Sequence, residues 1–280
     1  MRTCRAPALF LCLLAASSLA AASLAAAGDH PAQAAAAAQP PTAERVARQV
    51  QDRDTGRDSR AEMRMRLFDR QGRVRERGLT ISTLRAAAGD RTLVRFSAPG
   101  DIRNTSFLVW EHPDADDERF LYLPALGRVR RIAGEEKQES FVGSDLSYED
   151  IGGRDVADYA YSFADANAVW TAPDGARHPA WALESRARDR SAEFPRSVSI
   201  VLKDRLVVVH ADIYNRRDER AKVFDVRRLE LVDRIWTVLD LVVVNERDKT
   251  RTELTTTSIR YNLGLKENDF SRRELEQGVR

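Results

Sequence analysis

The stretch EMRMRLFD (Glu62–Asp69) carries the pattern that decides the fold of this 280-residue chain. Its apolar residues Met63, Met65 and Leu67 are separated by single arginines. A period of two places successive side chains on opposite faces of a β-strand, so one face of this segment is apolar and the other is largely charged. The stretch therefore predicts a half-buried strand.

The same alternation returns in many later runs, and short polar turns such as Arg70-Gln71-Gly72 separate them. Runs and turns of this kind are typical of antiparallel strands joined by hairpins. We expect about twelve strands and a mainly β fold. The later runs are Arg73–Leu84, Arg91–Ala98, Ser106–Glu111, Arg119–Leu123, Arg128–Ile132, Tyr159–Phe163, Trp181–Ala187, Arg196–Lys203, Leu206–Tyr214, Lys222–Leu231, Ile235–Val244 and Arg251–Tyr261.

Helical patterns are scarce in the chain. Thr42–Asp52 has a candidate N-cap at its threonine, and Glu135–Glu149 is interrupted by Gly143. A short turn at Ser271–Gln277 begins with a serine cap. Three short helices cannot cover a sheet of this size as densely as a second sheet could. Either the strands split into a sandwich, or a curved, open half-barrel keeps an apolar cavity under a helical lid. Periodicity alone leaves both open.

The N-terminus has the features of a secretory signal peptide. Arg2 and Arg5 precede the apolar run Ala8–Ala16, and small residues offer cleavage after Ala20 or Ala27. The alternative is an uncleaved anchor, but alanine makes up half of the uncharged run and is only weakly hydrophobic. We expect a signal peptide over residues 1–27, a flexible leader rich in alanine and proline over residues 28–41, and one domain over residues 42–280.

Composition limits the partners of the exported chain. The two cysteines, Cys4 and Cys12, both lie in the signal region, so the mature chain would contain no disulfide. Without the arginines at positions 2 and 5, the chain holds 43 basic and 43 acidic residues. Such a balance gives no electrostatic reason to expect nucleic acid as a partner.

Two neighbouring motifs connect the chain to a known family. The motif YLPALGRVRRI (Tyr122–Ile132) is followed by SFVGSDLSYED (Ser140–Asp150). Together with the segments at 96–110, 251–265 and 269–276, these motifs make the chain resemble the outer-membrane lipoprotein-sorting proteins, the LolA-like family. The resemblance implies an open half-barrel with a lid, which favours that architecture over a sandwich.

The resemblance also implies a function. LolA-like proteins suggest a periplasmic carrier that takes the acyl chains of lipoproteins or lipids from an inner-membrane exporter to an outer-membrane receptor, as a monomer and without a cofactor. The alternative is a lipid-sensing or accessory binding subunit of an envelope transporter or signalling complex. A carrier would pass its ligand to a second protein, whereas a sensor would keep it.

Apolar residues on the strands and in the second motif are the candidate ligand-binding residues. An apolar stripe at strand spacing is also what an ordinary core shows, so the pattern itself fits both readings. Ser140–Asp150 is either a mobile cover or a permanently packed connection, with a candidate cap at Ser147. The candidates for the cavity are Met63, Met65, Val94, Phe96, Leu108, Trp110, Tyr122, Phe141 and Tyr148.

Arg128, Arg130 and Arg131 are the candidates for the rim of the cavity, where they would meet an anionic headgroup or a partner protein. Arginine suits phosphate because its planar fork bonds two oxygens at once. The alternative is a solvated stripe on an outward strand face, since charged residues alternate throughout this chain.

No catalytic or metal-binding motif stands out. The four histidines are scattered without ligand spacing, and no nucleophile elbow or phosphate-binding glycine loop occurs. The acidic residues Asp145, Glu149, Asp150 and Asp155 lack the pattern of a calcium loop. We expect neither an enzyme nor a metal site.

Overall fold

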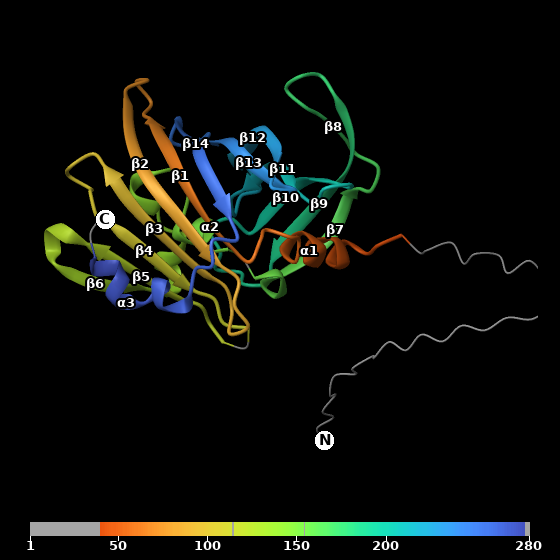
Figure 1. Cartoon of the computed structure of the whole chain (residues 1–280). Helices are drawn as coiled ribbons and strands as arrows, with labels where there is room; N and C mark the ends of the chain where they lie inside the picture. The colour runs from red at the N-terminus through yellow and green to blue at the C-terminus, as the bar shows by residue number, and fades with distance from the viewer. Residues whose placement is uncertain (1–39, 114, 154, 278–280) are drawn as a thin grey trace, which may run out of the picture. The chain divides into compact units, whose positions relative to one another are not determined.

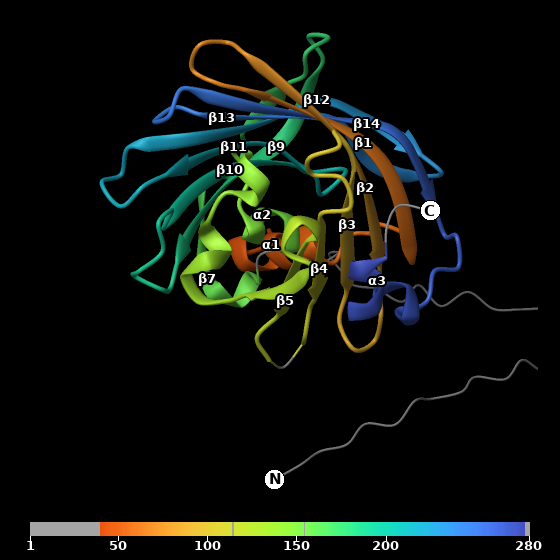
Figure 2. The ribbon, with the colours of Figure 1, turned by 90° about the vertical axis from the view of Figure 1, so that its left-hand side faces the viewer.

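The strands form one antiparallel sheet that curves without closing on itself (Figures 1 and 2). The computed structural model describes residues 40–113, 115–153 and 155–277. The predicted signal peptide and most of the predicted leader lie outside these residues. The described residues from Pro41 onward form one compact unit.

Fourteen strands are found in the described part of the chain, against about twelve expected, and only Val169–Thr171 has no counterpart among the predicted runs. They are β1 (Asp58–Phe68), β2 (Val74–Leu84), β3 (Arg91–Ala98), β4 (Ser106–Trp110), β5 (Glu118–Leu123), β6 (Arg128–Ile132), β7 (Tyr159–Asp165), β8 (Val169–Thr171), β9 (Arg177–Ala187), β10 (Arg196–Leu202), β11 (Val208–Tyr214), β12 (Arg220–Val232), β13 (Ile235–Asn245) and β14 (Thr250–Tyr261).

The strand order explains how the sheet is built. It runs β6-β5-β4-β3-β2-β1-β14-β13-β12-β11-β10-β9-β7, and β8 pairs with β9. The first and last strands thus meet in the middle, where Met65 of β1 lies opposite Leu254 of β14. Each half of the chain then extends outward by hairpins, so β6 and β7 become the two edges. The predicted mainly β fold with an open, curved sheet is confirmed.

The chain must cross from one edge of the sheet to the other between β6 and β7. It does so through Ala133–Asp158, which we call the lid segment. It contains four short elements: η2 (Gly134–Gln138), η3 (Phe141–Gly143), α2 (Tyr148–Gly152) and η4 (Val156–Asp158). Figure 2 shows α2 and α1 inside the curve of the sheet. Because the lid segment joins the two edges of a curved sheet, it lies on the concave face.

The predicted helix caps are present. In α1 (Ala43–Gln51), Oγ1 of Thr42 accepts the backbone N–H of Arg45. In α2, Oγ of Ser147 accepts the N–H of Asp150, whose carboxylate accepts the N–H of Ser147 in return, which forms a capping box. The serine at position 271 caps α3 (Arg272–Glu276), and η1 (Pro124–Leu126) and η5 (Glu267–Phe270) are single turns.

The helical segment predicted over Glu135–Glu149 is interrupted at Gly143 as expected, but little of the remainder is α-helical. The segment forms two single 3-10 turns, and α2 begins only at Tyr148. Val142 and Gly143 adopt left-handed backbone angles, with φ of 49° and 74°, so the right-handed helical path ends there. Gly143 marked this break in the sequence, but the valine did not.

Both faces of the sheet carry buried apolar clusters. The concave cluster contains Phe96 and Phe107 beneath the lid segment, and Val46 of α1 packs on a second concave cluster around Leu183. On the convex face, Phe270 and Leu275 from the C-terminal segment cover a third cluster. This third cluster contains Leu84, Leu93, Leu108 and Phe120.

Candidate lid and ligand-binding face

Four aromatic rings join the lid segment to the concave face of the sheet. The ring of Phe141 lies 5.8 Å from that of Phe96 and 5.5 Å from that of Phe107, between ring centroids. Tyr148 lies 5.2 Å from Phe107 and 5.5 Å from Phe141. Phe141 is fully buried, although it belongs to a connecting segment. The lid segment thus packs its apolar side chains directly on the concave face of the sheet.

A polar contact holds the tip of the lid segment to β14. Oδ2 of Asp145 accepts a hydrogen bond from Oγ1 of Thr252 at 2.7 Å, and its Oδ1 accepts another from Thr250. The backbone N–H of Asp145 also donates to Oγ1 of Thr252 at 2.9 Å. All three bonds lie in largely buried surroundings, where unpaired polar groups are costly.

Two basic side chains from the sheet bind carbonyl groups of the lid segment. Arg77 of β2 donates to the carbonyl of Val142, and its guanidinium lies over the ring of Phe96. Lys222 of β12 donates to the carbonyl of Asp145 at 2.8 Å and is buried. Burial lowers the pKa of Arg77, and the neighbouring Arg75 lowers it further. These bonds satisfy carbonyls that have no partner in the irregular lid backbone.

The structure divides the predicted cavity residues between the two faces. The lid and the concave cluster contain Met63, Met65, Val94, Phe96, Phe141 and Tyr148. The convex cluster under the C-terminal segment contains Leu108, Trp110 and Tyr122 instead. The indole Nε1 of Trp110 donates to the carbonyl of Phe270 at 2.7 Å. The two groups thus cannot line one cavity on the concave face.

Pairing between β3 and β4 decides this division. Val94 pairs with Phe107 and Leu93 pairs with Leu108, so Leu108 shares the face of Leu93 and not that of Val94. The stretch SFLVW of β4 is apolar or buried throughout because the lid covers one face and the C-terminal segment the other. A strand buried on both faces loses the alternation that would reveal its orientation.

The predicted rim arginines lie on β6, which is one edge of the sheet. Arg130 pairs with Glu136 of the lid segment at 3.1 Å, and Arg131 lies 3.9 Å from Glu118. Arg128 is exposed at the start of the strand. The edge position places them beside the lid, and their predicted contact with a headgroup or partner stays a prediction.

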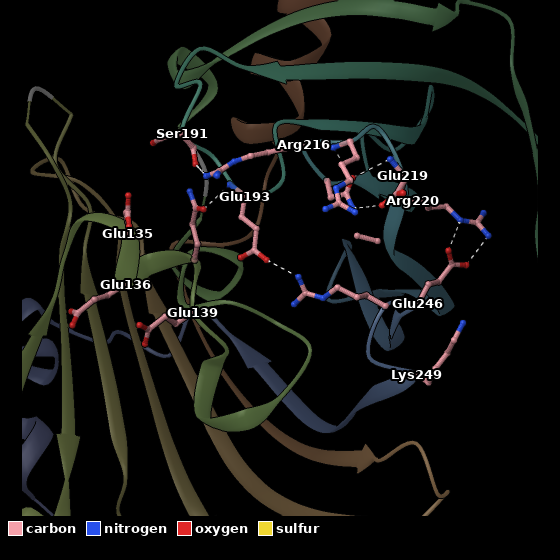
Figure 3. Close-up of a pocket in the computed structure, with 15 residues that line it drawn as sticks. Glu135, Glu136, Glu139, Ser191, Glu193, Arg216, Glu219, Arg220, Glu246 and Lys249 are labelled. Carbon is pink, nitrogen blue, oxygen red and sulfur yellow. Dashed lines mark hydrogen bonds and ion pairs between the residues drawn. The ribbon is translucent and has the colours of Figure 1, made fainter.

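A charged cleft opens beside the lid segment (Figure 3). It has a volume of about 1140 Å³, and Glu135, Glu136 and Glu139 of the lid lie on one side of it. The opposite side, formed by residues between 191 and 249, carries both charges, with ion pairs between Arg247 and Glu193 and between Arg220 and Glu246. Arg216, Arg217 and Lys249 also line this side.

The C-terminal end of α2 rests against the end of β4. A Cβ atom on Gly152 would lie 3.3 Å from Cγ2 of Val109 on β4 and 3.0 Å from Nε of Arg119 on β5, so a larger residue fits only if these side chains shift. Beside it, burial and then the charges of Asp90 and Asp117 together raise the pKa of Glu111 to about 7. This carboxyl therefore changes charge near neutral pH.

The sequence did not single out Arg77, Lys222, Thr250 or Thr252. Each of them is a polar residue at a strand position that faces the concave side, where apolar residues predominate. Thr252, for example, shares the concave face of β14 with Leu254. Asp145 entered the sequence analysis only as a weak metal candidate.

Within the described residues, no group of three or more His, Cys, Asp or Glu side chains is placed to hold a metal ion. Nor does any helix in this part of the chain have the length and hydropathy needed to span a membrane.

Comparisons with known proteins agree with this architecture. A family model described as "uncharacterized protein"-like matches residues 88–277. A DUF1329 family protein from Desulfovibrio piger is 30% identical, with a TM-score of 0.75 over 83% of this chain and 97% of that one. A candidate outer membrane lipoprotein-sorting protein domain from Vibrio parahaemolyticus is 27% identical, with a TM-score of 0.76 over 84% and 98% of the two chains.

A more distant structure shares the fold alone. A LolA superfamily protein from Nitrosomonas europaea is 12% identical, with a TM-score of 0.64 over 84% of this chain and all of that one. No curated protein sequence matches the chain significantly.

Proposed function

This chain belongs to the DUF1329 family of LolA-like proteins, and on that basis we propose that it is a periplasmic carrier for the acyl chains of lipoproteins or lipids. The observation that carries the proposal is the contact between the lid rings, Phe141 and Tyr148, and the concave rings, Phe96 and Phe107. Acyl chains can take the place of the lid rings because apolar packing is not directional.

The physical need for such a carrier comes from the cost of exposing acyl chains to water. At about 0.8 kcal/mol per methylene, a chain of about fifteen methylenes carries roughly 12 kcal/mol of transfer free energy. A lipidated molecule crosses an aqueous compartment far more readily when a protein covers this surface. In return, an acyl chain on the concave face compensates for the apolar contacts that the displaced lid gives up.

The polar bonds around Asp145 support a cover that can be displaced. They fasten one end of the lid through a few side chains, Thr250, Thr252 and Lys222, and not through a continuous strand pairing. Water can replace such bonds when the lid moves, so opening costs much less than disrupting the sheet. The carrier would load at an inner-membrane exporter and unload at an outer-membrane receptor, as a monomer without a cofactor.

Native mass spectrometry of the protein purified without detergent from a bacterial periplasm tests the proposal. We expect a co-purifying lipid or lipopeptide with the wild-type chain. Met63→Glu, at a half-buried position on the concave face, should abolish the complex, whereas Val129→Glu, at a half-buried position in the convex cluster, should preserve it. A folded wild-type protein that stays ligand-free after mixing with membrane lipids would refute the proposal.

A second function has one observation in its favour. The charged cleft beside the lid offers both acidic and basic side chains, as a contact surface for a partner protein would. In that function the chain would be a lipid-sensing or accessory subunit that reports on its ligand and does not deliver it. Mixing the loaded protein with an unloaded acceptor, such as a second LolA-like protein, separates the two, because only a carrier gives its ligand away.

A further inference from the structure

Two neighbouring hairpins, near the Asp145 contact that holds the lid segment to β14, carry basic side chains that form no ion pair within the described residues. The hairpins join β1 to β2 and β13 to β14, and because β1 pairs with β14 their ends lie side by side (Figure 1). Between them lies an open cleft of about 980 Å³. Its lining is Asp69, Arg70, Gln71, Arg73, Val74, Arg75, Arg247, Asp248, Lys249 and Thr250.

The acidic residues of this cleft are already engaged by their own hairpins. Asp69 accepts the side chain of Arg73 at 2.6 Å and the backbone N–H groups of Gln71 and Arg73. These bonds lower the pKa of Asp69, although its desolvation acts in the opposite direction. Asp248 accepts the side-chain amide of Asn245 at 2.9 Å and pairs with Arg247.

Three basic side chains of the two hairpins take no part in these pairs. Arg70, Arg75 and Lys249 are exposed, and none of them forms an ion pair within the described ranges 40–113, 115–153 and 155–277. The hairpin pair therefore has a surplus of positive charge although the mature chain as a whole is balanced. Such a local surplus attracts anions and not neutral or cationic partners.

The composition of the lining favours phosphate headgroups of a membrane over a folded protein partner. Protein interfaces are enriched in aromatic side chains, methionine and arginine and are depleted of lysine. Of the enriched types only arginine lines this cleft, and a lysine lines it as well. Its one large apolar residue is Val74, which is 44% exposed at the start of β2 between two arginines. An exposed aliphatic side chain surrounded by flexible cations suits the boundary between headgroups and acyl chains.

We infer that the β1–β2 and β13–β14 hairpins form a docking surface for a membrane rich in anionic phospholipids. This surface lies next to the lid segment, because Thr250 lines the cleft and also donates a hydrogen bond to Asp145 of the lid segment. A membrane bound here would lie against the latched end of the lid. The inference concerns attachment and stands whether or not the concave face carries acyl chains.

Vesicle co-sedimentation tests the inference directly. The purified protein is mixed with vesicles of phosphatidylcholine alone or of phosphatidylcholine with phosphatidylglycerol. We expect binding to the anionic vesicles only, weakening as salt is raised. In the variant R70Q/R75Q/K249Q, affinity for the anionic vesicles should fall on the order of a hundredfold, since each cation near an anionic surface contributes several-fold.

A matched variant controls for net charge. R103Q/R177Q/R260Q removes the same number of exposed cations, which also lack ion pairs among the described residues, from other parts of the surface. It should bind anionic vesicles as the wild type does. Equal binding of the wild type to both kinds of vesicle, or an equal loss in the two triple variants, would overturn the inference. Because all six positions are exposed, circular dichroism should show that both variants are folded.

Discussion

The carboxylate of Asp145 and the hydroxyl of Thr252 lie 2.7 Å apart, oxygen to oxygen, and tie the lid segment to the central strand β14. Thr252 is fully buried on the concave face, beside the apolar cluster that contains Leu254. A buried hydroxyl needs a partner, and the lid supplies it only in the closed arrangement. In this arrangement the pair therefore satisfies a buried polar group of the sheet and one of the lid segment at once.

Replacing Asp145 by alanine should loosen the lid. The hydroxyls of Thr250 and Thr252 would lose a charged acceptor, at a cost of about 2 kcal/mol. Hydrogen exchange of residues 140–151 should then accelerate more than exchange in the central strands. Glu135→Ala is the control, since it removes an exposed carboxylate from the same segment without disturbing the latch. Similar exchange in the two variants would argue against the latch.

Replacing Gly89 by alanine should destabilise the protein strongly. A Cβ atom there would lie 1.9 Å from the carbonyl oxygen of Glu111, and the backbone φ is 104°. Gly72 is a useful control because its φ is also positive, at 78°, but a Cβ meets nothing within 4 Å. Urea unfolding should show a loss of about 1 kcal/mol for Gly72→Ala and of about 3 kcal/mol or more for Gly89→Ala. Equal losses would mean that the β4 end moves aside at little cost.

The raised pKa of Glu111 makes stability depend on pH. Its pKa is about 7 in the folded chain against an ordinary value of 4.5, because of burial and then the charges of Asp90 and Asp117. The neutral carboxyl thus contributes stability that is complete below pH 4.5 and is lost as the pH rises through 7. Arg91 and Arg119 oppose the shift without cancelling it.

Glu111→Gln should remove this dependence. The amide stays neutral, so the variant should be more stable than the wild type above pH 7, by on the order of 1 kcal/mol once solvent screening is considered. Thermal unfolding from pH 4 to pH 9 measures it, with the exposed Glu76→Gln as the control. A constant difference between the Glu111 variant and the wild type across this range would contradict the assignment.

Trp110→Phe should release the C-terminal segment without affecting the lid. The variant keeps a ring against Phe120, 5.3 Å away between centroids, but loses the hydrogen bond to the carbonyl of Phe270. Limited proteolysis should become faster at residues 266–277. Phe141→Leu should have the opposite pattern, with faster cleavage in the lid segment. Faster cleavage in the same segment for both variants would mean that the two faces are not independent.

Several features of the fold could be predicted from sequence because their causes are local. Alternation in Glu62–Asp69 specified a strand, and the serine at 147 with Asp150 three residues later specified a cap. The candidate site was harder. Phe96, Phe141 and Tyr148 were identified and do meet, whereas Trp110 was assigned to the same face as Phe96 and lies on the other.

The sequence by itself determined the hairpin strands, the helix caps and the place where the lid backbone breaks, since each depends on residues a few positions apart. Only the tertiary structure decided which side of each strand faces the concave side. Alternation separates the side chains of a strand into two sets, but the pairing with neighbouring strands decides which set lies on which face of the sheet. It also decided that Asp145 meets Thr252, 107 residues away. Such a contact depends on how the sheet curves, and the curvature arises from the packing of all its strands together.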